Sequence, residues 1–198
     1  AGLLRACIRA VGGQDVIVPV SGWRSRAEQQ AIWDETLKTE GEPFTRQYVA
    51  RPGCSEHETG LAIDLGRAAE TIDFIRPDFP AYGVWGAFRR RAAEFGFVLR
   101  YPAGKEAVTG IGHEPWHFRY VGIPHAAVMA ERGLVLEEYL ALLRRAHTRT
   151  PLQVRAGARC FQILFRPAWD ASLPPPERGT YRQVSGDNCG GVVITTWK

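Results

Sequence analysis

The stretch that decides the fold is SEHETGLAID at residues 55–64, and a second stretch, EPWH at residues 114–117, complements it. Together they supply two imidazoles and a carboxylate that can bind one metal ion, those of His57, His117 and Asp64. Three protein ligands leave the fourth position of a zinc ion to water, as in catalytic sites, whereas structural sites fill all four positions, usually with cysteine. With Glu114 as a spare carboxylate, the pattern predicts a hydrolytic zinc site.

The spacing of His57 and Asp64 predicts a bend in the chain. Residues seven positions apart would lie on opposite faces of a straight strand, because strand side chains alternate between the two faces. Gly60 lies between them and can adopt backbone conformations that other residues avoid. We therefore expect His57 on a loop and Asp64 within a strand at 61–65, with both side chains directed at one ion.

The third donor is expected to come from a neighbouring strand at 117–121, which His117 opens. His113 could compete with His117, but the strand direction favours His117 because it carries this side chain inward. Glu114 precedes His117 by three positions, and Pro115 prevents an ordinary helix between them. A carboxylate in this place can take the proton of a metal-bound water, which makes Glu114 the candidate general base.

Arg24 lies at a predicted strand-to-helix junction. The apolar run 16–20 predicts the strand, and the helix is expected over 26–40 with Ser25 as N-cap and Glu28 completing a capping box. Such junctions commonly hold site residues. The alternative is a structural salt bridge at the end of the strand.

We expect an α+β fold with a small central antiparallel sheet, flanked by helices, and a zinc site in the cleft. The other expected elements are helices ending near 11 and covering 85–95, 124–132 and 136–147, and a strand at 97–101. Residues 41–55 are expected to be a loop, because they contain Pro43, Pro52 and Gly53. Short β-rich runs replace helical periodicity near the C-terminus. We therefore expect a catalytic domain at 1–149 and a small β-rich C-terminal extension at 150–198.

Composition suits an ordinary globular protein, with 198 residues, 45% hydrophobic content and a net charge of +4. The densest basic run, 89–91, lies on the predicted solvent face of the helix at 85–95, so no nucleic-acid partner is expected. No apolar run approaches the roughly 20 residues needed to span a bilayer. Membrane association is expected only through an N-terminal anchor that this chain lacks.

The four cysteines are too few for a disulfide-rich scaffold, and none forms a C-x-x-C pair. In an oxidising compartment, Cys160 and Cys189 are the first choice for a disulfide, because both lie in the terminal segment. Cys54 lies three residues before His57. A thiolate ligand there would close the position that the reactive water needs, so Cys54 is expected to be a buried, packed thiol.

The pair of motifs, SxHxxGxAxD at 55–64 and ExWH at 114–117, resembles the signature of the zinc D-alanyl-D-alanine peptidases of the VanX, VanY and VanXY type. This family is associated with vancomycin resistance and the trimming of peptidoglycan. SGWRS at 21–25 and PWHFRYVG at 115–122 are also similar, and PGCSEH at 52–57 is especially like the VanY and VanXY members. The resemblance covers roughly residues 14–145.

The resemblance implies that His57, Asp64 and His117 hold Zn²⁺ and that Glu114 is the base. It further implies that Arg24 polarises the scissile carbonyl and stabilises the oxyanion. The substrate-binding residues that follow from it are Ser55, Gln29, Trp116 and Ser21. Of these, Ser21 is expected to influence whether a dipeptide or a longer precursor is accepted.

We therefore expect a zinc D,D-carboxypeptidase that hydrolyses the terminal D-Ala-D-Ala bond of peptidoglycan precursors, with D-Ala-D-Ala dipeptidase activity as a second activity. One alternative is an L-alanyl-D-glutamate cell-wall endopeptidase with the same zinc pattern. Another is a non-catalytic, zinc-stabilised binding module, which would not need Glu114 together with Arg24. The expected place of action is the cell envelope, with the cytoplasm as the alternative.

Overall fold

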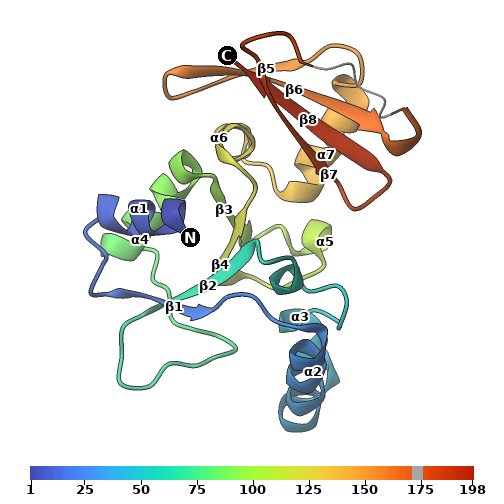
Figure 1. The fold of residues 1–198 in the computed structure, drawn as a ribbon. Coiled ribbons are helices and arrows are strands. Elements are labelled where there is room, and N and C mark those ends of the chain that lie inside the picture. Colours follow the sequence, from blue (N-terminus) through green and yellow to red (C-terminus); the bar gives the residue numbers. More distant parts are fainter. Residues whose placement is uncertain (171–175) are drawn as a thin grey trace. The chain divides into compact units, whose positions relative to one another are not determined.

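The computed structural model describes residues 1–170 and 176–198, and these form two compact units, Ala1–Ala126 and Ala127–Lys198 (Figure 1). Each unit contains a four-stranded sheet in which all the strand pairs are antiparallel. The expected α+β fold with a C-terminal β-rich part is confirmed. Among the described residues, no helix combines the length and the apolar character that crossing a bilayer requires.

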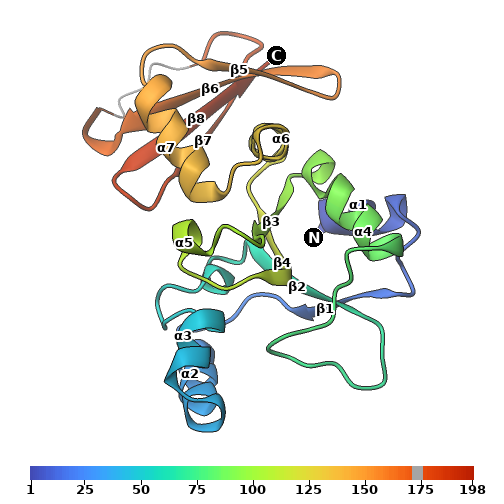
Figure 2. The same ribbon diagram turned by 180° about the vertical axis from the view of Figure 1, so that it is seen from behind.

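The sheet of the first unit has the strand order β1-β2-β4-β3. Its strands are β1 (Ile17–Ser21), β2 (Ala62–Arg67), β3 (Phe97–Tyr101) and β4 (Glu114–Tyr120). The helices of this unit are α1 (Gly2–Ala10), α2 (Arg26–Glu40), α3 (Glu42–Tyr48), α4 (Gly83–Arg91) and α5 (Glu106–Thr109), with short 3-10 helices η1 (Glu56–Thr59) and η2 (Ala92–Phe95). The two views show α2 beside α3 and α1 beside α4 (Figures 1 and 2).

The start of α2 forms the expected capping box. The Ser25 hydroxyl oxygen accepts a hydrogen bond from the Glu28 backbone N–H at 3.2 Å, and the Glu28 carboxylate accepts one from the Ser25 N–H at 2.7 Å. These bonds satisfy two of the backbone donors that the first helical turn leaves free. The helix therefore begins sharply after Ser25, which fixes the backbone next to Arg24.

The expected loop over 41–55 is wrong for Glu42–Tyr48, which form α3. Pro43, counted as a loop signal, lies in the first turn of this helix. Proline is tolerated there because the first backbone N–H groups of a helix have no intrahelical partner. The helix follows α2 after a single residue, Gly41, whose φ is +83°.

Strand β4 packs into the core of the first unit through Phe118. Phe118 is fully buried and meets two other buried rings edge to face, with centroid distances of 5.4 Å to Phe79 and 5.0 Å to Phe88. Leu65 of β2 is also fully buried in this core. Because side chains alternate along β4, the burial of Phe118 directs its neighbour His117 to the other face of the sheet.

The second unit contains the strands β5 (Leu152–Ala156), β6 (Arg159–Pro167), β7 (Tyr181–Gly186) and β8 (Gly191–Trp197), in the order β5-β6-β8-β7. Helix α7 (Leu136–Ala146) packs on β6, and η3 (Ala168–Asp170) follows that strand. Helix α6 (Ile123–Arg132) crosses the division between the units. Division of the chain into domains at 149/150 stays a prediction.

All four cysteines are free thiols, and Cys54 is exposed, so the expectation of a buried Cys54 is wrong. Its N–H donates to the carbonyl of Arg51 in a turn ahead of η1. Cys160 and Cys189 do not form the expected disulfide. They lie at opposite ends of the β6–β8 ladder, which runs from Phe161 opposite Trp197 to Pro167 opposite Gly191. Six residues of strand span about 20 Å, far beyond the reach of a disulfide.

Candidate active site

Three segments bring the predicted metal donors together. His57 lies on η1, and Asp64 and His117 lie on the adjacent strands β2 and β4, where they are direct cross-strand partners. Gly60 ends η1 with a φ of +69°, the left-handed conformation that favours glycine. The bend expected between His57 and Asp64 is therefore present, and Gly60 makes it.

The donor atoms of these three residues lie within 4.8 Å of one another. Nε2 of His57 is 3.1 Å from Oδ2 of Asp64, and Nδ1 of His117 is 3.1 Å from Oδ1 of the same carboxylate. All three residues are at most 5% exposed. The alternative ligand, His113, is exposed and lies outside this cluster.

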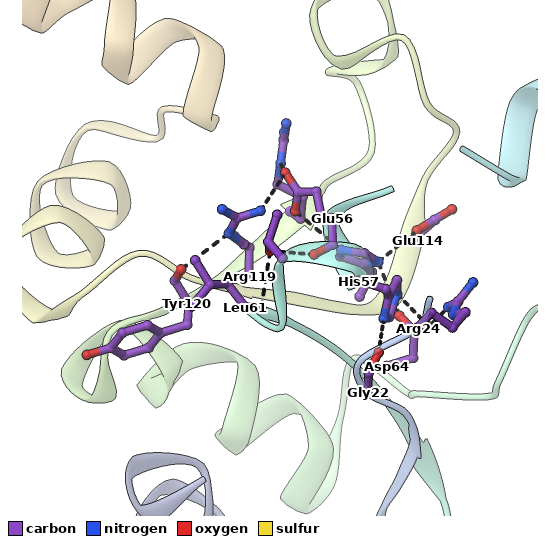
Figure 3. A network of polar contacts seen from close by, with 12 residues as sticks. Gly22, Arg24, Glu56, His57, Leu61, Asp64, Glu114, Arg119 and Tyr120 are labelled. Carbon is purple, nitrogen blue, oxygen red and sulfur yellow. Dashed lines mark hydrogen bonds and ion pairs between the residues drawn. The ribbon is translucent and has the colours of Figure 1, made fainter. Parts of the chain in front are cut away.

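The donor set fits a metal ion in both chemistry and orientation. Nδ1 of His57 is 2.6 Å from the carbonyl oxygen of Gly22, which is the partner that a ligand histidine needs for its second ring nitrogen (Figure 3). This contact leaves Nε2 of His57 with its lone pair toward Asp64. Nε2 of His57 and Oδ1 of Asp64 are buried without a hydrogen bond. Such unsatisfied buried atoms need an explanation, and a cation between them supplies one.

Glu114 lies beside these donors, with Oε2 3.5 Å from Nδ1 of His117, and is 5% exposed. Burial raises the pKa of Glu114 to about 8; the negative charge of Asp64 acts in the same direction, and the positive charge of Arg24 opposes it. A pKa closer to neutrality lets a carboxyl group both accept and return a proton, which suits an acid–base residue. By contrast, contacts with the two histidines outweigh burial and hold the pKa of Asp64 well below its usual range.

Arg24 is fixed at the edge of the site by three acceptors. Its Nε donates to Oγ of Ser21 at 3.1 Å, its Nη1 to Oε1 of Gln29 at 3.0 Å and its Nη2 to Oδ2 of Asp64 at 3.2 Å. Gln29 is itself held, because its Nε2 donates to the carbonyl of Ala50 at 2.8 Å. Ser21 and Gln29, predicted to bind substrate, thus contact Arg24 and orient its guanidinium.

A cleft of about 490 Å³, including the part open to solvent, adjoins these groups. The predicted residues that line it are Arg24, Gln29, Ser55, His57, Asp64, Glu114, Trp116 and His117. Ser21 is not among its lining residues, and Trp116 also packs into the core. The cleft therefore gathers the candidate metal donors, the candidate base and the candidate oxyanion group at one place.

The cleft also contains residues that the sequence interpretation missed, namely Glu56, Phe74 and Tyr101. The Arg24 guanidinium carbon lies 5.7 Å from the ring centroid of Phe74, and the Tyr101 ring is 5.0 Å from that of His117. Phe74 belongs to an irregular segment between β2 and α4, where periodicity offers no signal. Tyr101 ends β3, and only the pairing of β3 with β4 brings it to the site.

Glu56 lies next to His57 in the sequence but is directed toward His117. Burial acts to raise the pKa of Glu56, but contact with His117 and the charges of Arg100 and Arg119 lower it to about 2. Contacts with Asp64 and Glu56 raise the pKa of His117 to about 9, against the effect of burial. A ligand histidine needs an acid or a carbonyl at its second ring nitrogen, so a partner of this kind could be expected for His117. The sequence alone did not identify Glu56 as that partner.

Comparison with known proteins links the chain to one family and its relatives. Residues 4–123 match the family model described as VanY: D-alanyl-D-alanine carboxypeptidase. A bifunctional D-Ala-D-Ala dipeptidase and carboxypeptidase, VanXYC of Enterococcus gallinarum, is 46% identical over 133 residues, which are 67% of this chain and 70% of that protein. A D-alanyl-D-alanine carboxypeptidase of Enterococcus faecium is 33% identical over 187 residues, 94% of this chain and 55% of that protein. The chain thus spans only part of each relative.

Solved structures show the same likeness. The vancomycin-resistance D,D-dipeptidase VanXYg, in complex with a D-Ala-D-Ala phosphinate analogue, superposes with a TM-score of 0.94 at 45% identity. The match covers 100% of this chain and 79% of the VanXYg chain. A mutant of the D,D-pentapeptidase VanY from a VanB-type resistance cassette, in complex with Zn(II), has a TM-score of 0.59 at 34% identity, covering 71% of this chain and 80% of its own.

Proposed function

Because the chain belongs to the VanY family of D-alanyl-D-alanine carboxypeptidases, we propose that it is a zinc-dependent hydrolase that removes the terminal D-alanine from peptidoglycan precursors ending in D-Ala-D-Ala. The free dipeptide D-Ala-D-Ala is the second proposed substrate. The similarity to a bifunctional dipeptidase and carboxypeptidase, and to a structure that binds a D-Ala-D-Ala analogue, supports both substrates.

The observation that carries this proposal is the position of Glu114 and Arg24 beside the three donors. Glu114 Oε2 is 3.5 Å from Nδ1 of His117, and Arg24 Nη2 is 3.2 Å from Oδ2 of Asp64. A zinc ion that only stabilises a binding module needs neither a buried spare carboxyl group nor a fixed guanidinium. A peptidase can use both, one for proton transfer and one for charge stabilisation.

The chemistry divides among these side chains as follows. When bound by His57, Asp64 and His117, Zn²⁺ supplies Lewis acidity that activates water and polarises a carbonyl group. Glu114 takes a proton from the attacking water and passes it to the nitrogen of the leaving D-alanine as the C–N bond breaks. Arg24 lies where the carbonyl oxygen gains negative charge and offers fixed N–H donors to it.

We propose that the protein acts in the cell envelope; the cytoplasm is the alternative. The net charge of +4 supports contact with the anionic cell wall. Immunoblotting of separated envelope and cytoplasmic fractions tests this part independently of the chemistry.

The test of function is hydrolysis of defined peptides by the zinc-loaded protein. A pentapeptide stem ending in D-Ala-D-Ala, the dipeptide D-Ala-D-Ala and a tetrapeptide stem ending in a single D-Ala are incubated separately. Free D-alanine is measured with a coupled D-amino-acid oxidase assay, and the remaining peptide is identified by mass. We expect release of D-alanine from the first two substrates and not from the tetrapeptide.

Other outcomes separate the alternatives. Cleavage between L-alanine and D-glutamate would make the chain an endopeptidase. Zinc binding without cleavage of any of the three substrates would favour a binding module.

A further inference from the structure

We propose that Glu56 is a positioning residue for the metal site: it holds His117 through the ring nitrogen that faces away from the other donors. This inference rests on the proposed zinc-dependent function. It concerns a side chain that is neither a metal donor nor the candidate base.

The two ring nitrogens of His117 face opposite carboxylates. Nδ1 is 3.1 Å from Oδ1 of Asp64, on the side of the other donors, and Nε2 is 3.5 Å from Oε2 of Glu56. Nε2 of His117 and Oε2 of Glu56 are both buried and form no hydrogen bond with another group of the described chain. Each is therefore the partner that the other lacks, and a shift of a few tenths of an ångström closes the bond.

A pair of arginines holds the other oxygen of Glu56. Its Oε1 accepts a hydrogen bond from Nε of Arg100 at 2.8 Å. The same oxygen lies 3.4 Å from Nη1 of Arg119 (Figure 3). Arg100 comes from β3 and Arg119 from β4, so the sheet itself fixes the carboxylate. The arginines use Oε1, and Oε2 is left for His117.

The contact of Glu56 Oε2 with Nε2 of His117 determines which nitrogen of this ring can bind a metal, namely Nδ1. An acceptor at Nε2 stabilises the ring form that carries its proton there, and this form leaves the lone pair of Nδ1 directed at the ion. A carboxylate behind a ligand histidine also raises the basicity of the ring. Loss of such a partner typically weakens metal binding about 10–100-fold.

The substitution Glu56→Gln tests this inference with little change in shape. Arginine offers only donors, so the amide oxygen is expected to turn toward Arg100 and the NH₂ group toward Nε2 of His117. A donor there favours the ring form with the proton on Nδ1, which opposes metal binding. Glu58→Gln is the matched control, because Glu58 lies on the same short helix but accepts a hydrogen bond from the N–H of Gly53.

Three measurements are made on the full chain at one pH. Zinc affinity is measured by competition with a chelating dye; we expect Kd to rise at least 10-fold in Glu56→Gln and to stay unchanged in Glu58→Gln. Long-range ¹H–¹⁵N spectra of the zinc-loaded parent should show His117 protonated at Nε2, with a slowly exchanging, downfield proton that shifts in Glu56→Gln. Thermal unfolding of the metal-free proteins reports any purely structural effect.

An unchanged Kd and an unchanged Nε2 proton in Glu56→Gln would overturn the inference, and so would a fall in metal-free stability alone. Zinc bound through Nε2 of His117 in the parent would also overturn it, and that measurement needs no variant. A parent chain that binds zinc but releases no D-alanine would refute the proposed function and leave the test of Glu56 intact.

Discussion

Asp64 and His117 face each other directly across strands β2 and β4, with Oδ1 of the carboxylate 3.1 Å from Nδ1 of the imidazole. A shift of one residue in this pairing would turn one of the two side chains to the opposite face of the sheet. The burial of Leu65 and Phe118 in the core, each next to one of these donors in the chain, opposes such a shift. The register of the sheet therefore holds two of the three candidate metal donors in place.

The first prediction concerns the candidate base. Glu114→Gln keeps the size of the side chain but removes its ability to accept and return a proton. We expect D-alanine release to fall about 10²–10⁴-fold while one zinc ion per chain is still bound. Turnover assays and metal analysis on the same preparation measure both quantities, and activity near that of the parent would exclude Glu114 as the base.

The second prediction concerns charge stabilisation by Arg24. Arg24→Lys keeps the charge but cannot reproduce the fork of donors that contacts Ser21, Gln29 and Asp64. We expect kcat to fall about 10²–10³-fold. The control is Arg26→Lys, an exposed position at the start of α2. Equal rates for the two variants would show that Arg24 serves only the structure.

Removal of the metal is the third prediction. Because His57, Asp64 and His117 converge within 4.8 Å, a bound cation links η1, β2 and β4 in the folded state only. We expect chelation to abolish activity and to lower the thermal unfolding midpoint. Zinc at 100 times its Kd contributes about 2.7 kcal/mol to stability. Calorimetry with zinc or magnesium added back measures the unfolding midpoint. Full activity after thorough chelation would show that the protein is not a metal enzyme.

The fourth prediction concerns pH and the C-terminal sheet. Oδ2 of Asp187 accepts a hydrogen bond from Nη2 of Arg144 at 2.6 Å, and its Oδ1 accepts from the backbone N–H groups of Cys189 and Gly191, each at 2.8 Å. Burial acts to raise the pKa of Asp187, but these bonds lower it on balance. The stabilisation is therefore complete above the ordinary carboxyl pKa and is lost as the pH falls through the lowered folded-state value.

Asp187→Asn should accordingly lower the free energy of unfolding at neutral pH by about 1.5–3 kcal/mol, as expected for a hydrogen-bonded charge. The difference from the parent should shrink in acid. Urea titrations at pH 7 and in the acid range measure it. Asp170→Asn is the control, since Asp170 pairs with Arg166 at the surface and its side chain is 46% exposed. A difference that does not change with pH would contradict the ion pair as the cause.

Local signals in the sequence predicted local structure well. The capping box at Ser25 and Glu28, and the bend at Gly60, depend on residues at most a few positions apart, and both are present. The wrong prediction of a loop at α3 also comes from relying on a local signal. Pro43 indicates a break in the chain, but the same fixed φ also suits the first turn of a helix, and the residues around it do not decide between these outcomes.

Contacts between residues that are distant in the sequence could not be predicted from such local signals. Glu56 and His117 are brought together only by the pairing of β2 with β4 and the position of η1. Ser21 and Gln29 were expected to bind substrate, which stays a prediction, and their contacts with Arg24 depend on the angle at which α2 leaves β1. Cys160 and Cys189 share a segment, yet the β6–β8 ladder keeps them apart.

The sequence by itself determined the types of donor, the bend that turns His57 back toward Asp64, and the α+β character of the chain, because caps, turns and strand alternation act over a few residues. Only the tertiary structure decided that His117 turns one nitrogen to Asp64 and the other to Glu56, and that Arg24 is held by three acceptors. These relationships depend on sheet register and core packing, which join residues that no local pattern connects.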